Sequence, residues 1–209
     1  MRRHTLRQFL HGAASVFGAS MGEEHLAPLV REIDADPAAR DMDGPGVVVV
    51  LDFSGIESAT ASYLKATLLW LLGRSGNVAS TAPGGASGPW NIYPMVAGLN
   101  AEISEELEEL LHRHERPCLE LLRDNETAIF AVRQRGPLDQ MLRATLLLLA
   151  DVGGATATEL HQRFPQPRPI TVTAWNNRLS ELNVRRLVRR TKHGRQWWYQ
   201  TLAQEVVNG

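Results

Sequence analysis

The hydrophobic pattern of the first part of the chain alternates between strand-like and helix-like stretches. Residues 47–51 read VVVVL, an apolar β-branched run bounded by turn residues, which predicts a strand covered on both faces. Residues 23–36 and 59–73 carry apolar residues at helical spacing. We therefore expect a mixed sheet with helices packed against it, in the α/β or α+β class.

Two further stretches have clear local signals. Residues 90–96 predict another strand, and Pro94 favours an edge position because proline has no backbone N–H for a ladder bond. A helix over residues 100–114 begins at Asn100, whose side chain can cap it. The weaker expectations are a first strand over 5–10, a surface loop over 73–89 and, over 118–122 and 127–132, either a hairpin or one strand after a helix end.

The pattern changes after residues 133–137, which read RQRGP. We predict the joint between two domains here, residues 1–133 and residues 134–209. Beyond the joint the expected order is three helices and a hairpin. The helices are expected over 138–152, over 156–164 (opened by a capping-box pattern) and from 170, and two strands are expected around a turn at His193 and Gly194.

The third of these helices has one apolar and one polar side. Its buried stripe is predicted to consist of Val172, Trp175, Leu179 and Leu182. The residues off the stripe are of types that bond base edges and phosphates. They include Thr173, Asn176, Asn177 and Arg178. At least one of Trp197, Trp198 and Tyr199 is expected to pack on this helix.

Charge is distributed unequally along the chain. The net formal charge is -1, but residues 1–154 hold 13 Lys/Arg against 20 Asp/Glu, whereas residues 155–209 hold 9 against 3. This asymmetry indicates that the C-terminal part meets a polyanion. The plainer alternative is a solvated basic face. The basic residues around the hairpin are Arg185, Arg186, Arg189, Arg190, Lys192 and Arg195.

Residues 138–202 resemble the winged helix-turn-helix superfamily of bacterial regulators. The segments that carry the resemblance are TATELHQRF and TAWNNRLSEL as the helix pair and LVRRTKHGRQWWY as the wing. The resemblance implies double-stranded DNA as the partner, read by the third helix and touched by the wing at the backbone or minor groove. Winged helices that bind protein instead remain the alternative.

The stretch VVVVLDFSGIESATASYLKATLLWLL resembles the STAS domain, and more closely the STAS-like domain of uncharacterised role. The resemblance implies a mixed sheet with flanking helices that docks a protein, often an ATPase-type kinase. Pairing of two copies as a homodimer is a further hypothesis, because most oligomers are symmetric dimers. Ser62 matches the serine that is phosphorylated in anti-sigma-factor antagonists. Thr60 replaces the expected acidic residue and Tyr63 the expected glycine.

Each of these front residues has a simpler structural role. Thr60 and Ser62 can cap the helix that follows them. Asp52 lies at a strand end, where sites gather in α/β folds, but it can equally accept hydrogen bonds from loop amides.

Other function classes have little support. The single cysteine, Cys118, excludes an internal disulfide, and no apolar run reaches the length of a membrane span, so a cytoplasmic protein without membrane contact is expected. Glu108, Glu109 and His112 lie on one predicted helix but form an incomplete metal-ligand set. Ser54 does not lie in a nucleophile elbow. We therefore expect no catalysis, no metal and no cofactor.

The leading hypothesis is a DNA-binding regulator whose front domain mediates protein interaction or dimerisation. The alternative is a protein-interaction adaptor, a subunit of a multi-component assembly that does not read DNA.

Overall fold

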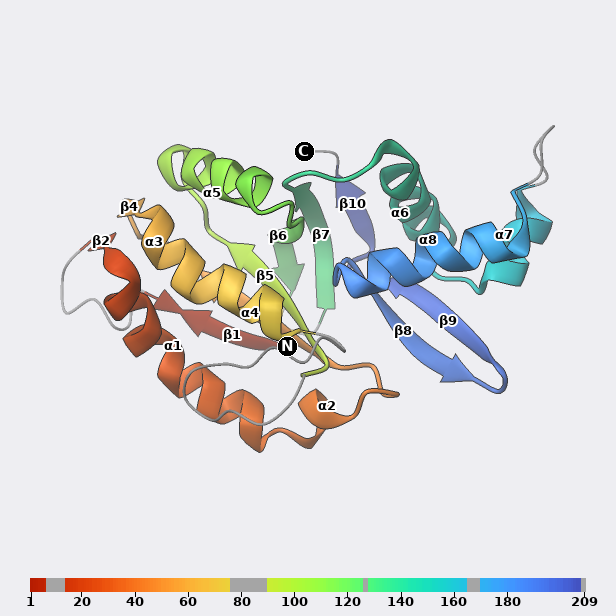
Figure 1. Ribbon diagram of the computed structural model, residues 1–209, viewed down its shortest axis with the longest axis horizontal. Coiled ribbons are helices and arrows are strands. Elements are labelled where there is room, and N and C mark those ends of the chain that lie inside the picture. The colour runs from red at the N-terminus through yellow and green to blue at the C-terminus, as the bar shows by residue number, and fades with distance from the viewer. Residues whose placement is uncertain (7–13, 76–89, 126–127, 165–169, 208–209) are drawn as a thin grey trace.

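The computed structural model describes residues 1–6, 14–75, 90–125, 128–164 and 170–207. Its centre is a mixed sheet of six strands in the order β1-β3-β5-β6-β7-β10 (Figure 1). Every neighbouring pair is parallel except β6 and β7, which are antiparallel. The strands are β1 (Arg2–Thr5), β3 (Val47–Asp52), β5 (Ile92–Ala97), β6 (Cys118–Asn125), β7 (Ala128–Arg135) and β10 (Glu205–Val207).

Strand β3 is buried along its whole length, as its apolar run predicts. Successive side chains of a strand point to opposite faces of the sheet. Accordingly Val47, Val49 and Leu51 join one apolar cluster, whereas Val48 and Val50 join another. The prediction of a strand covered on both faces is confirmed.

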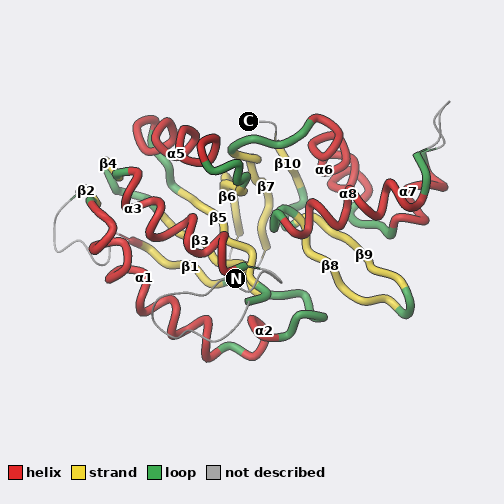
Figure 2. The backbone as a smooth tube through the Cα atoms, viewed as in Figure 1, coloured by secondary structure: helices red, strands yellow, loops and turns green. Residues whose placement is uncertain are grey.

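Helices from the first part of the chain cover one face of the sheet (Figures 1 and 2). The helix predicted over residues 59–73 is present, but its middle is a π-helical segment. The Thr67 hydroxyl donates to the Tyr63 carbonyl at 2.9 Å, and a hydroxyl that competes for a backbone carbonyl disturbs regular α-helical bonding. The elements are α1 (Gly18–Ala35), α2 (Pro37–Arg40), α3 (Ala61–Leu64), η2 (Lys65–Leu69), α4 (Trp70–Arg74) and α5 (Ala101–Arg113), with a small strand pair β2 (Ser15–Val16) and β4 (Ser58–Ala59).

The edge position predicted for the strand that contains Pro94 is wrong. Strand β5 lies inside the sheet, between β3 and β6. Strand β6 pairs only with Met95, Val96 and Ala97, so Pro94 lies where β5 has a single neighbour and a missing N–H is tolerated.

The other predictions for the first part differ mainly at element ends. Asn100 caps α5 by accepting a hydrogen bond from the Ile103 N–H at 2.9 Å, as predicted. Of the two alternatives for residues 118–132, the hairpin is confirmed. The first strand begins and ends earlier than predicted, at Arg2 and Thr5, and residues 7–13 lie outside the described chain. Most of the predicted loop, residues 76–89, is also outside it.

The last part of the chain has the predicted order of three helices and a hairpin. Thr156 and Glu159 form the predicted capping box at the start of the second helix. One backbone feature was not predicted: Ala155 pairs with Tyr199 through N–H···O bonds of 2.9 and 3.0 Å, which adds a short third strand to the hairpin. The elements are α6 (Gln140–Val152), α7 (Ala157–Arg163), α8 (Val172–Val184), β8 (Val188–His193) and β9 (Gln196–Thr201).

These C-terminal elements cover the second face of the sheet. Val50, Tyr93 and Met95 of the sheet belong to the same apolar cluster as Leu149 of α6 and Leu182 of α8. Strand β10 follows the hairpin and pairs with β7 at the edge of the sheet (Figure 1). The predicted boundary after residue 133 therefore falls inside β7, and both predicted domains contribute residues to one of the two apolar clusters.

None of the helices in the described part of the chain combines the length and the apolar character needed to cross a bilayer.

Candidate nucleic-acid interface

Helix α8 packs on the core through one side and exposes the other. Trp175, Leu179 and Leu182 are buried, as predicted, but Val172 is 38% exposed. The buried stripe therefore begins one turn later than predicted, at Trp175. Val172 is the first residue of α8, directly after the Thr171 cap, and stays exposed. The exposed polar side chains of the helix include Thr173, Asn176 and Asn177.

A surface cavity of about 340 Å³ lies between α8, the start of α7 and the hairpin. It brings together Thr173, Asn176 and Arg195, which the sequence pattern selected from two different elements. We call this the α8–hairpin groove. Thr158 and Gln196 also line it, and sequence reasoning missed both. Their positions in the sequence could have indicated them, because Thr158 is in the first turn of α7 and Gln196 directly follows the hairpin turn.

The hairpin turn carries exposed basic residues. Lys192 and Arg195 are exposed on either side of Gly194, whose φ of +62° is the left-handed conformation that glycine adopts most easily. A ring contact stabilises the turn: the ring of His193 stacks on the ring of Trp198 with centroids 5.6 Å apart. The two cations are therefore held at the end of an ordered hairpin.

Three further arginines of the motif do not line the groove and are held by aromatic or buried surroundings. The guanidinium of Arg190 lies 4.3 Å from the ring centre of Trp197, and that of Arg178 lies 5.5 Å from the ring centre of Trp175. Arg189 is half-buried, and burial lowers its pKa. Of the three aromatic residues at the end of the motif, Tyr199 is the one fully in the core, whereas Trp197 and Trp198 are half-buried.

Arg185 lies away from the groove. It follows the last turn of α8, roughly 18 Å along the helix from Thr173 at 1.5 Å per residue. Its Nε donates to Glu181 Oε1 at 2.7 Å. Arg185 lines a different cavity, beside Glu108 and Arg143.

Arg186 is placed in the core, so we remove it from the interface that the sequence predicted. It is 6% exposed, and its guanidinium lies 5.2 Å from the ring centre of Tyr93 on strand β5. Nη1 donates to Asn91 Oδ1 at 3.3 Å. Burial lowers the pKa of Arg186, and its φ of +61° is strained for a residue with a side chain. The residue anchors the end of α8 on the sheet.

The two hydroxyl residues of the STAS-like motif lie together at the start of α3. Thr60 Oγ1 accepts from the Tyr63 N–H at 3.4 Å and from the Gly18 N–H at 3.1 Å. Ser62 is exposed, and its Oγ lies 3.1 Å from Thr60 Oγ1. Thr60 is thus a helix cap that also ties α3 to the start of α1.

Asp52 is buried at the end of β3. Burial alone raises the pKa of its carboxyl group, but hydrogen bonds from Ser54 and from Arg3 outweigh burial and leave the pKa below its ordinary value. The Ser54 N–H donates to Oδ1 at 3.0 Å and Arg3 Nε donates to Oδ2 at 2.9 Å. Of its two predicted roles, Asp52 has the geometry of the acceptor for a loop amide.

The helical Glu-x-x-His pattern does not lead to a metal site in the described residues, where no three His, Cys, Asp or Glu side chains gather as ligands. His112 Nδ1 instead contacts the Glu108 carbonyl at 2.9 Å and the Glu108 carboxylate at 3.6 Å. Comparison of the chain with protein-family models, with curated proteins and with solved structures gave no match.

Proposed function

We propose that this protein is a DNA-binding protein of the winged-helix type that contacts the duplex through α8 and the β8–β9 hairpin. The observation that carries the proposal is the α8–hairpin groove. Polar residues that can bond bases or phosphates, Thr173 and Asn176, face the same space as the exposed cation Arg195. Lys192 lies just across the hairpin turn from Arg195.

Two features support this reading of the groove. The N-terminus of α8 opens toward it, and helix N-termini favour the negative charge of phosphate. The bridge between Ala155 and Tyr199 gives the hairpin a third strand, which holds it at a fixed position relative to the helix pair. A fixed angle between helix and hairpin is what simultaneous contact with groove and backbone requires.

The test is the salt dependence of binding to a random-sequence duplex. We expect affinity to fall steeply with salt, because Lys and Arg displace counterions from phosphate. Changing both Lys192→Gln and Arg195→Gln should reduce the slope of log K against log salt by roughly 2, at about 0.9 for each lost phosphate contact. Arg31→Gln, an exposed arginine on α1, is the matched control and should leave the slope unchanged.

Binding that does not depend on salt, or a double variant with the same slope as the unaltered protein, would overturn the proposal. Asn176→Ala then tests the helix separately. It should weaken binding by a similar factor at every salt concentration, because the Asn176 amide is uncharged and displaces no counterion.

The second candidate function is protein docking at the start of α3, and one observation favours it. Phe17 is 54% exposed, and the N–H of the next residue, Gly18, donates to Thr60. The backbone next to an exposed aromatic residue is therefore bonded to the helix start that carries the exposed hydroxyl of Ser62. Exposed aromatic residues are favoured anchors in protein interfaces.

Self-association provides a direct test of the homodimer version of this candidate. If the surface pairs two copies, sedimentation should show a dimer that Phe17→Ser dissociates, while Val184→Ser, a change at an exposed apolar residue elsewhere, leaves it intact. A monomer at all concentrations excludes self-pairing. Docking of an ATPase-type kinase would then be tested by phosphorylation at Ser62.

A further inference from the structure

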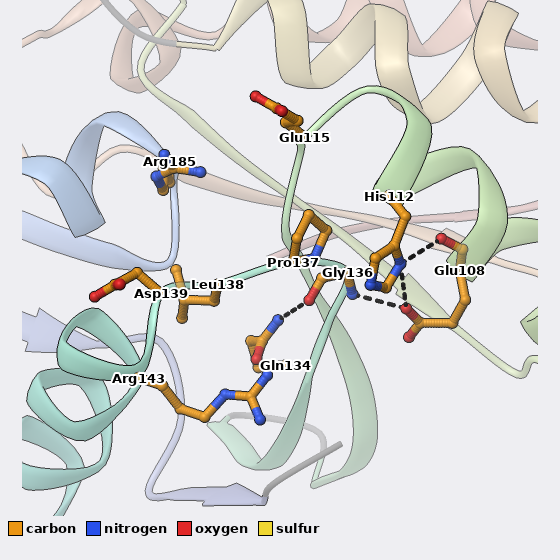
Figure 3. Close-up of a pocket in the computed structure, with 10 residues that line it drawn as sticks. All are labelled: Glu108, His112, Glu115, Gln134, Gly136, Pro137, Leu138, Asp139, Arg143 and Arg185. Carbon is orange, nitrogen blue, oxygen red and sulfur yellow. Dashed lines mark hydrogen bonds and ion pairs between the residues drawn. The ribbon is translucent and has the colours of Figure 1, made fainter.

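A second cavity, of about 710 Å³, lies where the two parts of the chain meet (Figure 3). Its walls come from α5, from the segment that joins β7 to α6, and from α6 and the end of α8. Small-molecule sites are typically of this size and often form where two structural units meet. We call it the joint cavity.

One wall of the joint cavity contains a buried hydrogen-bond acceptor without a partner. Gln134 is 4% exposed, and its amide nitrogen donates to the Arg135 carbonyl at 2.8 Å and the Gly136 carbonyl at 2.6 Å. These two bonds fix the amide orientation, so Oε1 is the acceptor that remains. Oε1 has no hydrogen bond in the described part of the chain. A buried acceptor left unsatisfied costs about 1–3 kcal/mol.

The same cavity contains a cation without a counterion. Arg143 extends from α6 toward Gln134 (Figure 3), and among the described residues its side chain has no ion pair and no hydrogen bond. Its Nε is buried and unsatisfied. Arg185, the other arginine of the cavity, already bonds Glu181. Arg143 is therefore the group available for a ligand carboxylate.

The acidic residues of the lining would repel a ligand that carries only negative charge. Glu108, Glu115 and Asp139 line the cavity together with only two arginines. Glu108 lies on α5, across the joining segment from Arg143, and accepts from the Gly136 N–H at 3.0 Å (Figure 3). The Glu108 carboxylate also accepts from Arg135 Nη1 at 3.4 Å. A ligand amino group can donate to the unpaired oxygen of Gln134, while the carboxylates of the lining attract its positive charge.

We propose that the joint cavity binds a small zwitterion of the α-amino acid class. The ligand carboxylate pairs with Arg143, and its ammonium group donates to Gln134 Oε1 within the negatively charged lining that includes Glu108. The proposal is independent of nucleic-acid binding, because none of the groove residues lines the joint cavity. Since the walls come from both parts of the chain, an occupied cavity holds α5 and α6 together.

The experiment is a direct binding measurement on the full chain. Each of the twenty standard amino acids is added at about 10 mM and the unfolding temperature is recorded, because a ligand that binds only the folded state raises it. A positive amino acid is then titrated calorimetrically. Arg143→Met should weaken its binding at least ten-fold, since a charge-assisted bond is lost. Arg31→Met, on α1 and outside the cavity, should bind as the unaltered protein does.

Ligand analogues test the chemistry without altering the protein. The carboxylic acid that lacks the amino group and the amide that lacks the carboxylate should each bind at least ten-fold more weakly than the amino acid. The proposal is overturned if none of the twenty raises the unfolding temperature, if Arg143→Met binds normally, or if the deaminated acid binds equally well. The last result would indicate a simple anion site at Arg143.

Discussion

Five basic residues of the last quarter of the chain illustrate three different environments, although they look alike in the sequence. Lys192 and Arg195 are exposed at the hairpin turn. Arg178 and Arg190 lie on tryptophan rings. Arg186 is buried against Tyr93. Charge counting alone treats all of them as one surface, but only the exposed ones are free to meet phosphate.

Arg186 and Arg195 should therefore respond to substitution in opposite ways. Arg186→Ala should lower the free energy of unfolding by about 1–3 kcal/mol, because it removes a buried contact with an aromatic ring. Duplex affinity of the folded variant should remain unchanged. Arg195→Ala should alter stability by less than about 0.5 kcal/mol, as exposed positions generally do, but reduce the salt slope of binding by about 1. Urea denaturation measures the stability of the two variants, and duplex titration measures their binding. If Arg186→Ala and Arg195→Ala have equal effects on stability or on binding, the distinction between a buried and an exposed arginine is wrong.

Asp52 gives the fold a defined dependence on pH. Its folded-state pKa is lower than the ordinary value of 3.8, so the folded protein favours the carboxylate. The resulting stabilisation is fully present above the ordinary pKa and is lost as the pH falls through the lower, folded-state pKa. Asp52→Asn should therefore destabilise the protein at pH 7, and the difference between variant and unaltered protein should shrink below pH 3.8.

Denaturation midpoints at pH 7, 5 and 3 measure this dependence. Asp151→Asn, at an exposed position on α6, serves as the control and should differ little from the unaltered protein. A difference for Asp52→Asn that is the same at pH 7 and pH 3 would show that the carboxylate contributes no proton-linked stability.

At the scale of elements, two neighbouring hydroxyl residues at the start of α3 have different roles: Thr60 caps the helix, and Ser62 is the candidate for modification. Thr60 accepts from two backbone N–H groups, whereas the exposed Ser62 hydroxyl contacts only Thr60 among the side-chain bonds of the described chain. Thr60→Ala should lower the free energy of unfolding by about 1–2 kcal/mol, the usual effect of losing a threonine cap. Ser62→Ala should change it by less than about 0.5 kcal/mol. Chemical denaturation compares the free energies of unfolding of the two variants. An equal decrease for both would show that Thr60 does not act as the helix cap.

Most elements could be predicted because their signals are local. The run of valines in β3, the Asn100 cap of α5 and the capping box of α7 each involve neighbouring residues and were identified from the sequence. The position of β5 inside the sheet was missed, because it depends on where β6 stops pairing. The bridge of Ala155 to Tyr199 was missed for the same reason: the partners are far apart in the sequence.

The candidate site was likewise predictable where its signals are local and was missed where they depend on distant parts of the chain. Thr173, Asn176 and Arg195 were selected as polar or basic residues within a recognisable motif, and they line one groove. The burial of Arg186 was not predictable, because its partner Tyr93 lies in a strand of the other predicted domain. The joint cavity was missed as well, since its lining residues are drawn from elements separated by much of the chain.

At the scale of the whole molecule, the C-terminal elements complete the sheet as well as forming the candidate interface. Asn183 near the end of α8 donates to the Tyr93 hydroxyl at 3.5 Å, and the guanidinium of Arg186, just after α8, lies over the ring of the same tyrosine on β5. Helix α8 is thus attached to the sheet at one end and exposes its polar residues toward the other. Any change in the front part that moves β5 would be transmitted to α8 through these contacts.

The shared core predicts that the front part does not fold well alone. A fragment of residues 1–137 lacks the helices that cover Val50, Tyr93, Met95 and Leu119, and would expose these side chains as one apolar patch. We expect it to aggregate, or to bind a hydrophobic dye and unfold without cooperativity. A chain of residues 1–204, which lacks only β10, should stay soluble and unfold cooperatively at a lower temperature, because it loses the edge pairing with β7 but retains the apolar core. Calorimetry and dye binding on both fragments provide the test. If residues 1–137 unfold cooperatively at the temperature of the full chain, the two parts are independent domains and the shared core contributes nothing to stability.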